Sequence, residues 1–341
     1  MKKNVFLLLL GLLVALALAG CGEKSQKDVV EALDEKVAKM TGYKADAKMT
    51  LQTGNDPQVY QVEIWHKEPE YYRVNLKNAE KDQSQMILRN DDGVFVLTPA
   101  LNKSFHFQSD WPQNSSQAYL VESLVNDIKS DPEAKFTATK DNYVFETKTN
   151  YKNNKMLPIQ EITINKKDLA PVQVKVMDPD RNPLLIVDFK KVEFNASFDK
   201  SAFEVEKNMN SAQLELEEVP VMGEGNSKPF AVLYPEEGVI PGVELVEEKE
   251  MKTDDGIRYI LTFGGGEKSF TLIQERATVA PAGTTISVSG EPIDLGFTVG
   301  VLSENAISWT HEGVDFMVAS TDLTQEELYE IARTVQGKTV K

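Results

Sequence analysis

The sequence is poor in the residue types on which most catalytic and metal sites depend. Its 341 residues include one cysteine and three histidines. One cysteine cannot form an internal disulfide, and three histidines leave few ligands for a transition metal. His66, His106 and His311 do not form an H-E-x-x-H pattern, and no G-x-S-x-G element is present. We therefore expect no enzymatic activity, no metal site and no cofactor.

Basic residues are scarce relative to acidic ones. Lys and Arg number 37 against 53 Asp and Glu, which gives a net charge of −16. A nucleic-acid-binding protein normally shows an excess of basic residues or a basic stripe. Here the basic residues are spread among more numerous acids, so we do not expect a nucleic-acid partner.

The chain begins with an apolar run that is short for a membrane span. Val5 to Ala19 is about 15 residues, against the roughly 20 that a transmembrane helix needs. Lys2 and Lys3 precede it, so residues 1–20 have the form of a secretory signal.

The single cysteine follows this signal directly. Residues 18–21 read Leu-Ala-Gly-Cys and resemble a bacterial lipobox. Cys21 is then expected to be acylated and to become the first mature residue, with residues 21–27 as anchor and polar spacer. The alternative is a buried free cysteine. The lipobox interpretation predicts a protein held by its lipid on the extracytoplasmic face of the cell membrane.

Residues 28–206 show helical and strand periodicity in a characteristic order. Ser25 and Asp28 form a capping pattern before apolar residues at helical spacing, and a second helix is predicted at 116–129. Alternation over Tyr43–Leu51 opens a series of strands, and residues 90–93 (NDDG) predict a hairpin. Such a long antiparallel meander must curl. We therefore predict an α+β, mainly β fold: an incomplete antiparallel barrel (a half-barrel) with a helical lid.

The remainder of the chain differs in character. Residues 207–229 are acidic and rich in turn residues, which predicts a linker. Residues 230–341 contain a hairpin around residues 264–266, further short strands and a closing helix after Thr324. This region is predicted to be a smaller α+β C-terminal domain.

Two segments in the first region carry a family resemblance. Residues 65–74 (WHKEPEYYRV) and 90–99 (NDDGVFVLTP) resemble the strand–basic–proline–aromatic–arginine segment and the glycine hairpin of the bacterial lipoprotein-carrier (LolA/LolB/RseB-like) superfamily. The layout, including Trp309 to Ser320 and the closing helix, resembles Gram-positive sporulation- and germination-associated lipoproteins. The resemblance spans roughly residues 28–206. It implies a half-barrel that accepts acyl chains and a role in sporulation or germination.

Ten apolar residues are predicted to share inward parity on successive strands. A carrier-like protein would use them as a lipid-binding wall, whereas an ordinary fold would use them as core beneath the helices. They are Met49, Leu51, Val62, Ile64, Tyr72, Val74, Met86, Leu88, Phe105 and Phe107. Arg73 is a candidate for a lid or headgroup contact, or for a pair with a nearby acid.

Two functional hypotheses follow. The first is a lipid-anchored, non-catalytic, receptor-like protein that binds an acyl chain or a lipoprotein. The second is an envelope sensor or interaction module with a self-filled barrel, which regulates a protein partner in the membrane or cell wall.

Overall fold

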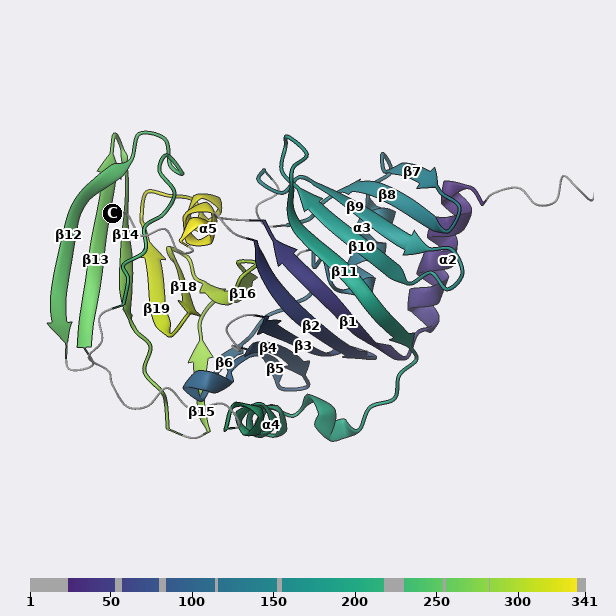
Figure 1. The fold of residues 1–341 in the computed structure, drawn as a ribbon, viewed down its shortest axis with the longest axis horizontal. Helices are drawn as coiled ribbons and strands as arrows, with labels where there is room; N and C mark the ends of the chain where they lie inside the picture. The colour runs from purple at the N-terminus through teal and green to yellow at the C-terminus, as the bar shows by residue number, and fades with distance from the viewer. Residues whose placement is uncertain are drawn as a thin grey trace, which may run out of the picture.

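The computed structural model describes residues 24–52, 57–79, 84–113, 116–151, 155–217, 230–253, 256–281 and 283–335. They form a twelve-stranded sheet and a seven-stranded sheet, which lie next to one another along the long axis of the molecule (Figure 1). One continuous apolar core runs through both sheets.

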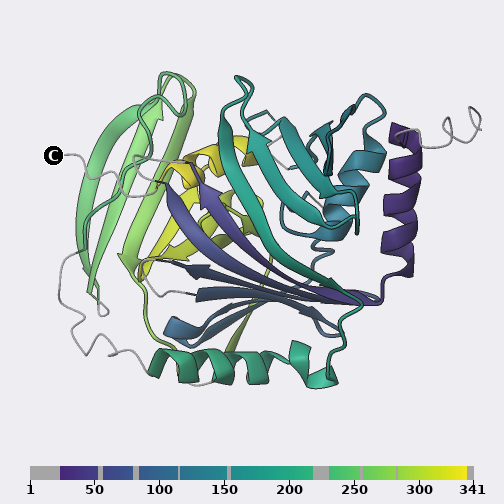
Figure 2. The same ribbon diagram turned by 45° about the vertical axis from the view of Figure 1, so that its right-hand side comes forward.

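The larger sheet is a curved meander with open ends (Figure 2). Its strand order is β15-β6-β5-β4-β3-β2-β1-β11-β10-β9-β8-β7, and no pairing within the described residues joins β15 to β7. The predicted half-barrel is therefore confirmed. Its strands are β1 (Gly42–Leu51), β2 (Gln58–Lys67), β3 (Tyr71–Asn78), β4 (Ser84–Asn90), β5 (Gly93–Thr98), β6 (Lys103–Phe107), β7 (Lys135–Ala138), β8 (Asn142–Lys148), β9 (Ile159–Asn165), β10 (Pro171–Met177), β11 (Pro183–Phe194) and β15 (Thr284–Val288).

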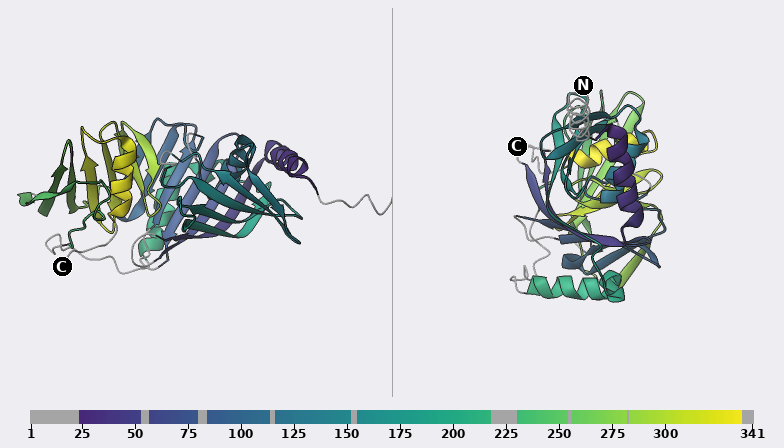
Figure 3. Two further views of the ribbon diagram at one scale, coloured as in Figure 1. Left: turned by 90° about the horizontal axis from the view of Figure 1, so that it is seen from above. Right: turned by 90° about the vertical axis from the view of Figure 1, so that its right-hand side faces the viewer.

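Two helices cover the inner, concave face of this sheet. α2 (Gln26–Lys39) begins with the predicted capping box, in which Ser25 and Asp28 bond reciprocally. α3 (Val121–Ser130) begins later than predicted, because residues 116–120 form turns. The apolar faces of both helices belong to the same core cluster as the inner strand residues. α2 lies at the end of the molecule that is far from the second sheet (Figure 3).

The smaller sheet has the order β12-β13-β14-β19-β18-β17-β16 and carries helix α5 (Gln325–Thr334). The predicted capping box at Thr324 is present. β12 and β16 were not predicted from the sequence. The strands are β12 (Glu244–Thr253), β13 (Gly256–Gly265), β14 (Lys268–Arg276), β16 (Glu291–Asp294), β17 (Val299–Leu302), β18 (Ala306–His311) and β19 (Val314–Ala319).

The two regions share a sheet. β15 comes from the C-terminal region, yet it pairs in parallel with β6 at the edge of the larger sheet. The C-terminal region is thus built onto the half-barrel by backbone hydrogen bonds as well as by the common core.

The predicted linker is wrong for its first half. Residues 207–217 belong to α4 (Val205–Glu217), which follows the short helix η2 (Lys200–Phe203); another short helix, η1 (Pro99–Leu101), precedes β6. α4 runs along the outer side of the larger sheet (Figure 2). There Met209 and Phe203 form a separate apolar cluster with residues of β4 and β5. Residues 218–229 lie outside the described part of the chain.

The packing of this outer cluster predicts that truncating two leucines will change the free energy of unfolding by different amounts. Leu88 is fully buried beneath η2 and α4, whereas Leu214 on α4 is 65% exposed. Leu88→Ala is expected to lower the free energy of unfolding by about 2–4 kcal/mol, since it opens a cavity in a packed core. The control Leu214→Ala is expected to change it by less than about 0.5 kcal/mol. Urea unfolding measures both, and equal effects would contradict the packing described.

Candidate ligand-binding site

Most of the predicted lipid-binding wall is filled core. Met49, Leu51, Val62, Ile64, Tyr72, Val74 and Phe107 are between 0% and 4% exposed. They pack in one cluster with apolar residues of α2, α3 and the neighbouring strands. Eight of the ten predicted residues share the inner face. Phe105 is the eighth, because it pairs with Val96, which in turn pairs with inner-facing Ile87.

The inward parity predicted for Met86 and Leu88 is wrong. Residues directly opposite one another on paired strands project to the same face. Val74 pairs with Ile87, whereas Leu88 pairs with Arg73. Met86 and Leu88 therefore face outward, where they pack with Phe203 and Met209.

Arg73 lies on the outer face as well. Its Nη1 is 2.9 Å from Glu63 Oε2, and its Nε donates to Asn208 Oδ1 at 2.7 Å. The guanidinium also lies over the Trp65 ring, 4.2 Å from the centroid. The structure thus supports the alternative that Arg73 pairs with a nearby acid. Through Asn208, Arg73 contacts α4 and not the inner lid.

A loop of the C-terminal region closes one end of the inner wall. Gly296, in the turn before β17, has φ +88°, and a Cβ there would lie 2.9 Å from Leu51 Cδ1. Only glycine adopts this conformation at so close an approach without strain. Leu295 and Phe297 beside it are buried in the shared core. This end of the predicted wall is therefore occupied by protein.

A cluster of polar side chains holds the lid helix α3 against the sheet. His66 Nε2 lies 3.1 Å from Glu122 Oε1, and the Tyr43 hydroxyl donates to Glu122 Oε2 at 3.2 Å. The Tyr43 oxygen also accepts from the backbone N–H of Val121 at the start of α3. His66 Nδ1 donates to the Tyr71 carbonyl at 3.2 Å. Since Nδ1 carries this proton, one further proton is needed between Nε2 and the Glu122 carboxyl group.

Burial shifts the pKa values of both ionisable groups in this cluster. It raises the pKa of Glu122 to about 7 and lowers the pKa of His66 to about 4. Both shifts disfavour the charged forms. Between about pH 4 and pH 7 the carboxyl group of Glu122 is consequently protonated and the His66 ring is neutral.

The raised pKa makes the stability of the lid depend on pH. The folded pKa of Glu122 lies above its ordinary value of 4.5, so its stabilising contribution is present below pH 4.5 and lost as the pH rises through about 7. The amide introduced by Glu122→Gln stays neutral. We expect Glu122→Gln to raise Tm relative to the wild type by about 2–4 °C at pH 8 and not at pH 5. Differential scanning calorimetry at the two pH values measures this.

Glu68→Gln is the matched control, because its carboxylate is half exposed and 3.7 Å from the same His66 nitrogen. Glu68→Gln should follow the wild type at both pH values. A Tm difference for Glu122→Gln that does not change with pH would contradict the raised pKa of Glu122.

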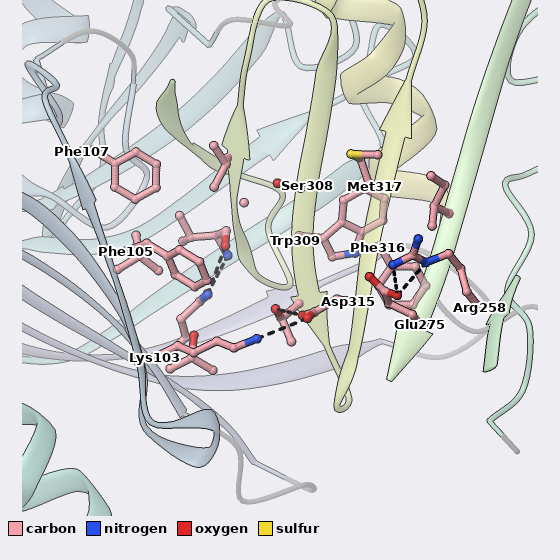
Figure 4. A pocket seen from close by; sticks show the side chains of 18 residues that line it. Lys103, Phe105, Phe107, Arg258, Glu275, Ser308, Trp309, Asp315, Phe316 and Met317 are labelled. Carbon is pink, nitrogen blue, oxygen red and sulfur yellow. Dashed lines mark hydrogen bonds and ion pairs between the residues drawn. The ribbon is translucent and has the colours of Figure 1, made fainter. Parts of the chain in front are cut away.

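A cavity of about 360 Å³ lies between the two sheets. One wall is the inner face of β4–β6, and the other is formed by β13, β14 and β17–β19. Figure 4 shows Phe105 and Phe107 on one side, with Ser308 and Asp315 pointing toward them from the opposite wall. Trp309 and Phe316 border the cavity as well, but the strand pairing places their side chains on the other face of the second sheet from Asp315. This volume falls within the range typical of small-molecule sites. The apolar lining consists of Val96, Phe105, Phe107, Ile273, Val299, Val301, Trp309, Phe316 and Met317.

Polar contacts join the two walls. The Gln85 side chain donates to the Val299 carbonyl at 3.1 Å and accepts from its N–H at 2.6 Å. Lys103 Nζ lies 3.3 Å from Asp315 Oδ2. On the far wall, Arg258 lies 2.7 Å from Glu275. A second cavity of about 100 Å³ shares Gln85 and other lining residues with the first.

The sequence identified only part of this site. Phe105 and Phe107 were predicted to face inward, and they line the cavity. Asp315 and Met317 of β19 line the cavity opposite β6, and both were predicted to belong to a separate domain. No local pattern in the sequence indicated that they would face β6.

Three other predictions concern the acylated cysteine, a metal site and a membrane span. Cys21 lies outside the described residues. Within the part of the chain that is described, no group of three or more His, Cys, Asp or Glu side chains is placed to hold a metal ion. No helix among those same residues is long and apolar enough to cross a membrane.

The sequence has clear relatives. Residues 1–203 match the family model described as sporulation protein YdcC-like. Sporulation protein YdcC of Bacillus subtilis (strain 168) is 54% identical over 340 residues, which cover 100% of this chain and 99% of that protein. The chain belongs to the YdcC-like sporulation protein family. The predicted resemblance to sporulation-associated proteins is thereby confirmed.

Solved structures of more distant proteins are also similar. The MucA/MucB complex of Pseudomonas aeruginosa contains a chain with 12% identity and a TM-score of 0.34, covering 92% of this chain and 100% of that one. A LolA superfamily protein from Nitrosomonas europaea has 10% identity and a TM-score of 0.31, covering 54% of this chain and 100% of its own.

Proposed function

We propose that this YdcC-like protein is a lipid-anchored, extracytoplasmic binding protein that holds an acyl chain in the cavity between its two sheets, without catalysis, during sporulation. The cavity is the observation that carries the proposal. The name of the Bacillus subtilis relative supports the sporulation context.

The cavity has the properties that an acyl chain requires. It is lined mainly by aromatic and aliphatic side chains from both sheets. Burying each methylene group of a chain against such a surface contributes about 0.8 kcal/mol. A volume of about 360 Å³ is near the lower end of the range for ligand sites, which favours one chain over the two chains of a phospholipid.

The anchor would orient the molecule. If Cys21 is acylated, the four residues 22–25 separate it from α2, and an extended spacer of that length reaches only about 15 Å. The α2 end of the molecule would then lie near the bilayer, with the second sheet directed away from it (Figure 3). Removal of residues 1–20 takes away two lysines and no acid, so the mature protein is even more acidic than −16. An anionic surface repels such a body, and the lipid would be the main attachment.

Replacing the cysteine tests the anchor. Cys21→Ala is expected to move the protein from the membrane fraction to the soluble or unprocessed fraction, because the lipid chains that hold it are absent. Cell fractionation, with detection of a radiolabelled fatty acid on the protein, measures this. Equal membrane retention of unlabelled Cys21→Ala and wild-type protein would contradict acyl anchoring.

Filling the cavity tests ligand binding. Val301 lines the cavity and is partly buried, whereas Val279 is 68% exposed outside it. Val301→Phe is expected to weaken binding of a fluorescent fatty acid by about tenfold or more, equivalent to ~1.4 kcal/mol. The control Val279→Phe should bind like the wild type. Identical affinity of all three proteins would place the ligand elsewhere.

The filled inner wall supports a second candidate function. Six of the predicted wall residues do not line the cavity and pack against protein at 0–4% exposure, which leaves no room for a chain beneath α2 and α3. A protein of this kind could serve as an envelope sensor or interaction module. It would be favoured if no lipid or fatty acid bound to the purified protein and a cross-linked envelope protein were recovered instead.

A further inference from the structure

One side chain in the cavity differs in character from the rest of its lining. Lys103, at the start of β6, is only 9% exposed, although lysines are almost never buried without a strong reason. Its ammonium group reaches across the cavity toward Asp315, 3.3 Å away (Figure 4). The side chain stands beside Phe105, two residues along the same face of β6.

The pair with Asp315 leaves Lys103 able to take another partner. An ammonium group has three N–H donors, and Asp315 is its one ionic partner among the described residues. Asp315 in turn has a second contact, because its Oδ1 accepts from the Thr310 hydroxyl at 2.5 Å. A bound anion could therefore contact Lys103 while Asp315 keeps a hydrogen bond.

A buried polar atom next to Lys103 has no hydrogen-bond partner in the part of the chain that the structure describes. It is Thr98 Oγ1, which belongs to the same cavity lining. Thr98 lies directly opposite Lys103 in the β5–β6 pairing, so the two side chains share one face of the sheet. Buried polar groups are nearly always bonded, so an unbonded hydroxyl beside a buried ammonium group indicates a missing partner.

Arg258, the other cation of the lining, does not share these properties. Its side chain is 39% exposed, and both its Nε and its Nη2 contact Glu275 at 2.7 Å. It is partly solvated and held by Glu275, whereas Lys103 is buried within the cavity lining. The position for an anionic group is therefore the Lys103 end of the cavity.

We propose that the ligand of this cavity is an anionic single-chain amphiphile whose carboxylate or phosphate binds Lys103, with the Thr98 hydroxyl as a further donor. Its chain lies along Phe105 and Phe107, the next inward-facing residues of β6. This inference rests on the proposed acyl-chain function and adds the charge, polarity and orientation of the ligand.

The test compares probes with the same chain and different head groups. Oleate and oleyl alcohol are titrated by calorimetry, below their aggregation limits at pH 8, into the chain from residue 22 onward. Wild-type protein is expected to bind oleate at least about tenfold more tightly than oleyl alcohol, because a charge-assisted hydrogen bond is stronger than a neutral one. Lys103→Met should remove this preference and retain alcohol binding. Lys249→Met, on the exposed strand β12, is the control and should keep the preference.

Asp315→Asn provides a second variant that does not remove the cation. It eliminates the competing carboxylate and keeps an oxygen that can accept from Thr310, so oleate should bind several-fold more tightly.

A lysophosphatidate with the same chain distinguishes the two sources of the anion. Tighter oleate binding indicates a free fatty acid, and tighter lysophosphatidate binding indicates a phospholipid-derived ligand; either supports the inference.

The failures of the two proposals are distinguishable. Equal affinity of the wild type for oleate and oleyl alcohol, or an unchanged preference in Lys103→Met, would overturn the anionic-ligand inference and leave acyl binding intact. No binding of any of the three probes to the wild type would overturn both.

Discussion

The inner face of the curved sheet must be covered along its whole length, because an open sheet of this size exposes an apolar surface that its own curvature does not close. Helices α2 and α3 cover one part of it, where Glu122 of α3 meets Tyr43 on β1 and His66 on β2. The C-terminal region covers another part, through the loop at Gly296 against Leu51 of β1 and through the second sheet opposite β4–β6. This division explains why the two regions share one core, and why β15 is joined to the edge strand β6.

The cavity is a consequence of this arrangement. The two sheets are joined by direct polar contacts such as Gln85 to Val299, and next to these contacts they leave a space. Its lining is mainly apolar, with the buried cation of Lys103 and the unpaired Thr98 hydroxyl on neighbouring strands. The lid helix does not contribute to this space. Its proton-dependent contacts through His66 and Glu122 instead secure the filled part of the half-barrel.

Local signals in the sequence predicted the elements whose two faces differ. The capping pattern at Ser25, the alternation over Tyr43–Leu51 and the hairpin at residues 90–93 all appear as predicted. The predicted orientation of Met86 and Leu88 was wrong for a physical reason. Met86, Ile87 and Leu88 are all buried, because β4 is covered by core on one face and by α4 on the other. A strand covered on both faces has no alternation from which its parity can be read.

The remaining failures have related causes. β12 is exposed on both faces, so its charged sequence shows no strand period. It is held by pairing with β13 and by the hydrogen bond from the Tyr234 hydroxyl to Glu248. The acidic residues 207–217 suggested a linker because only a few apolar positions, such as Met209 and Ala212, are buried against the sheet. The cavity depends on residues about 200 positions apart, Lys103 and Asp315 among them, which no local pattern brings together.

The central claim is that the space between the sheets holds an acyl chain. Native mass spectrometry of the chain from residue 22 onward, purified without detergent from an expression host that supplies lipids, tests it most directly. The account predicts an adduct with the mass of a single-chain fatty acid or lysophospholipid, which is lost when Val301→Phe fills the cavity of a protein that still folds. A single unliganded mass for the wild type, even after incubation with fatty acid, would contradict it.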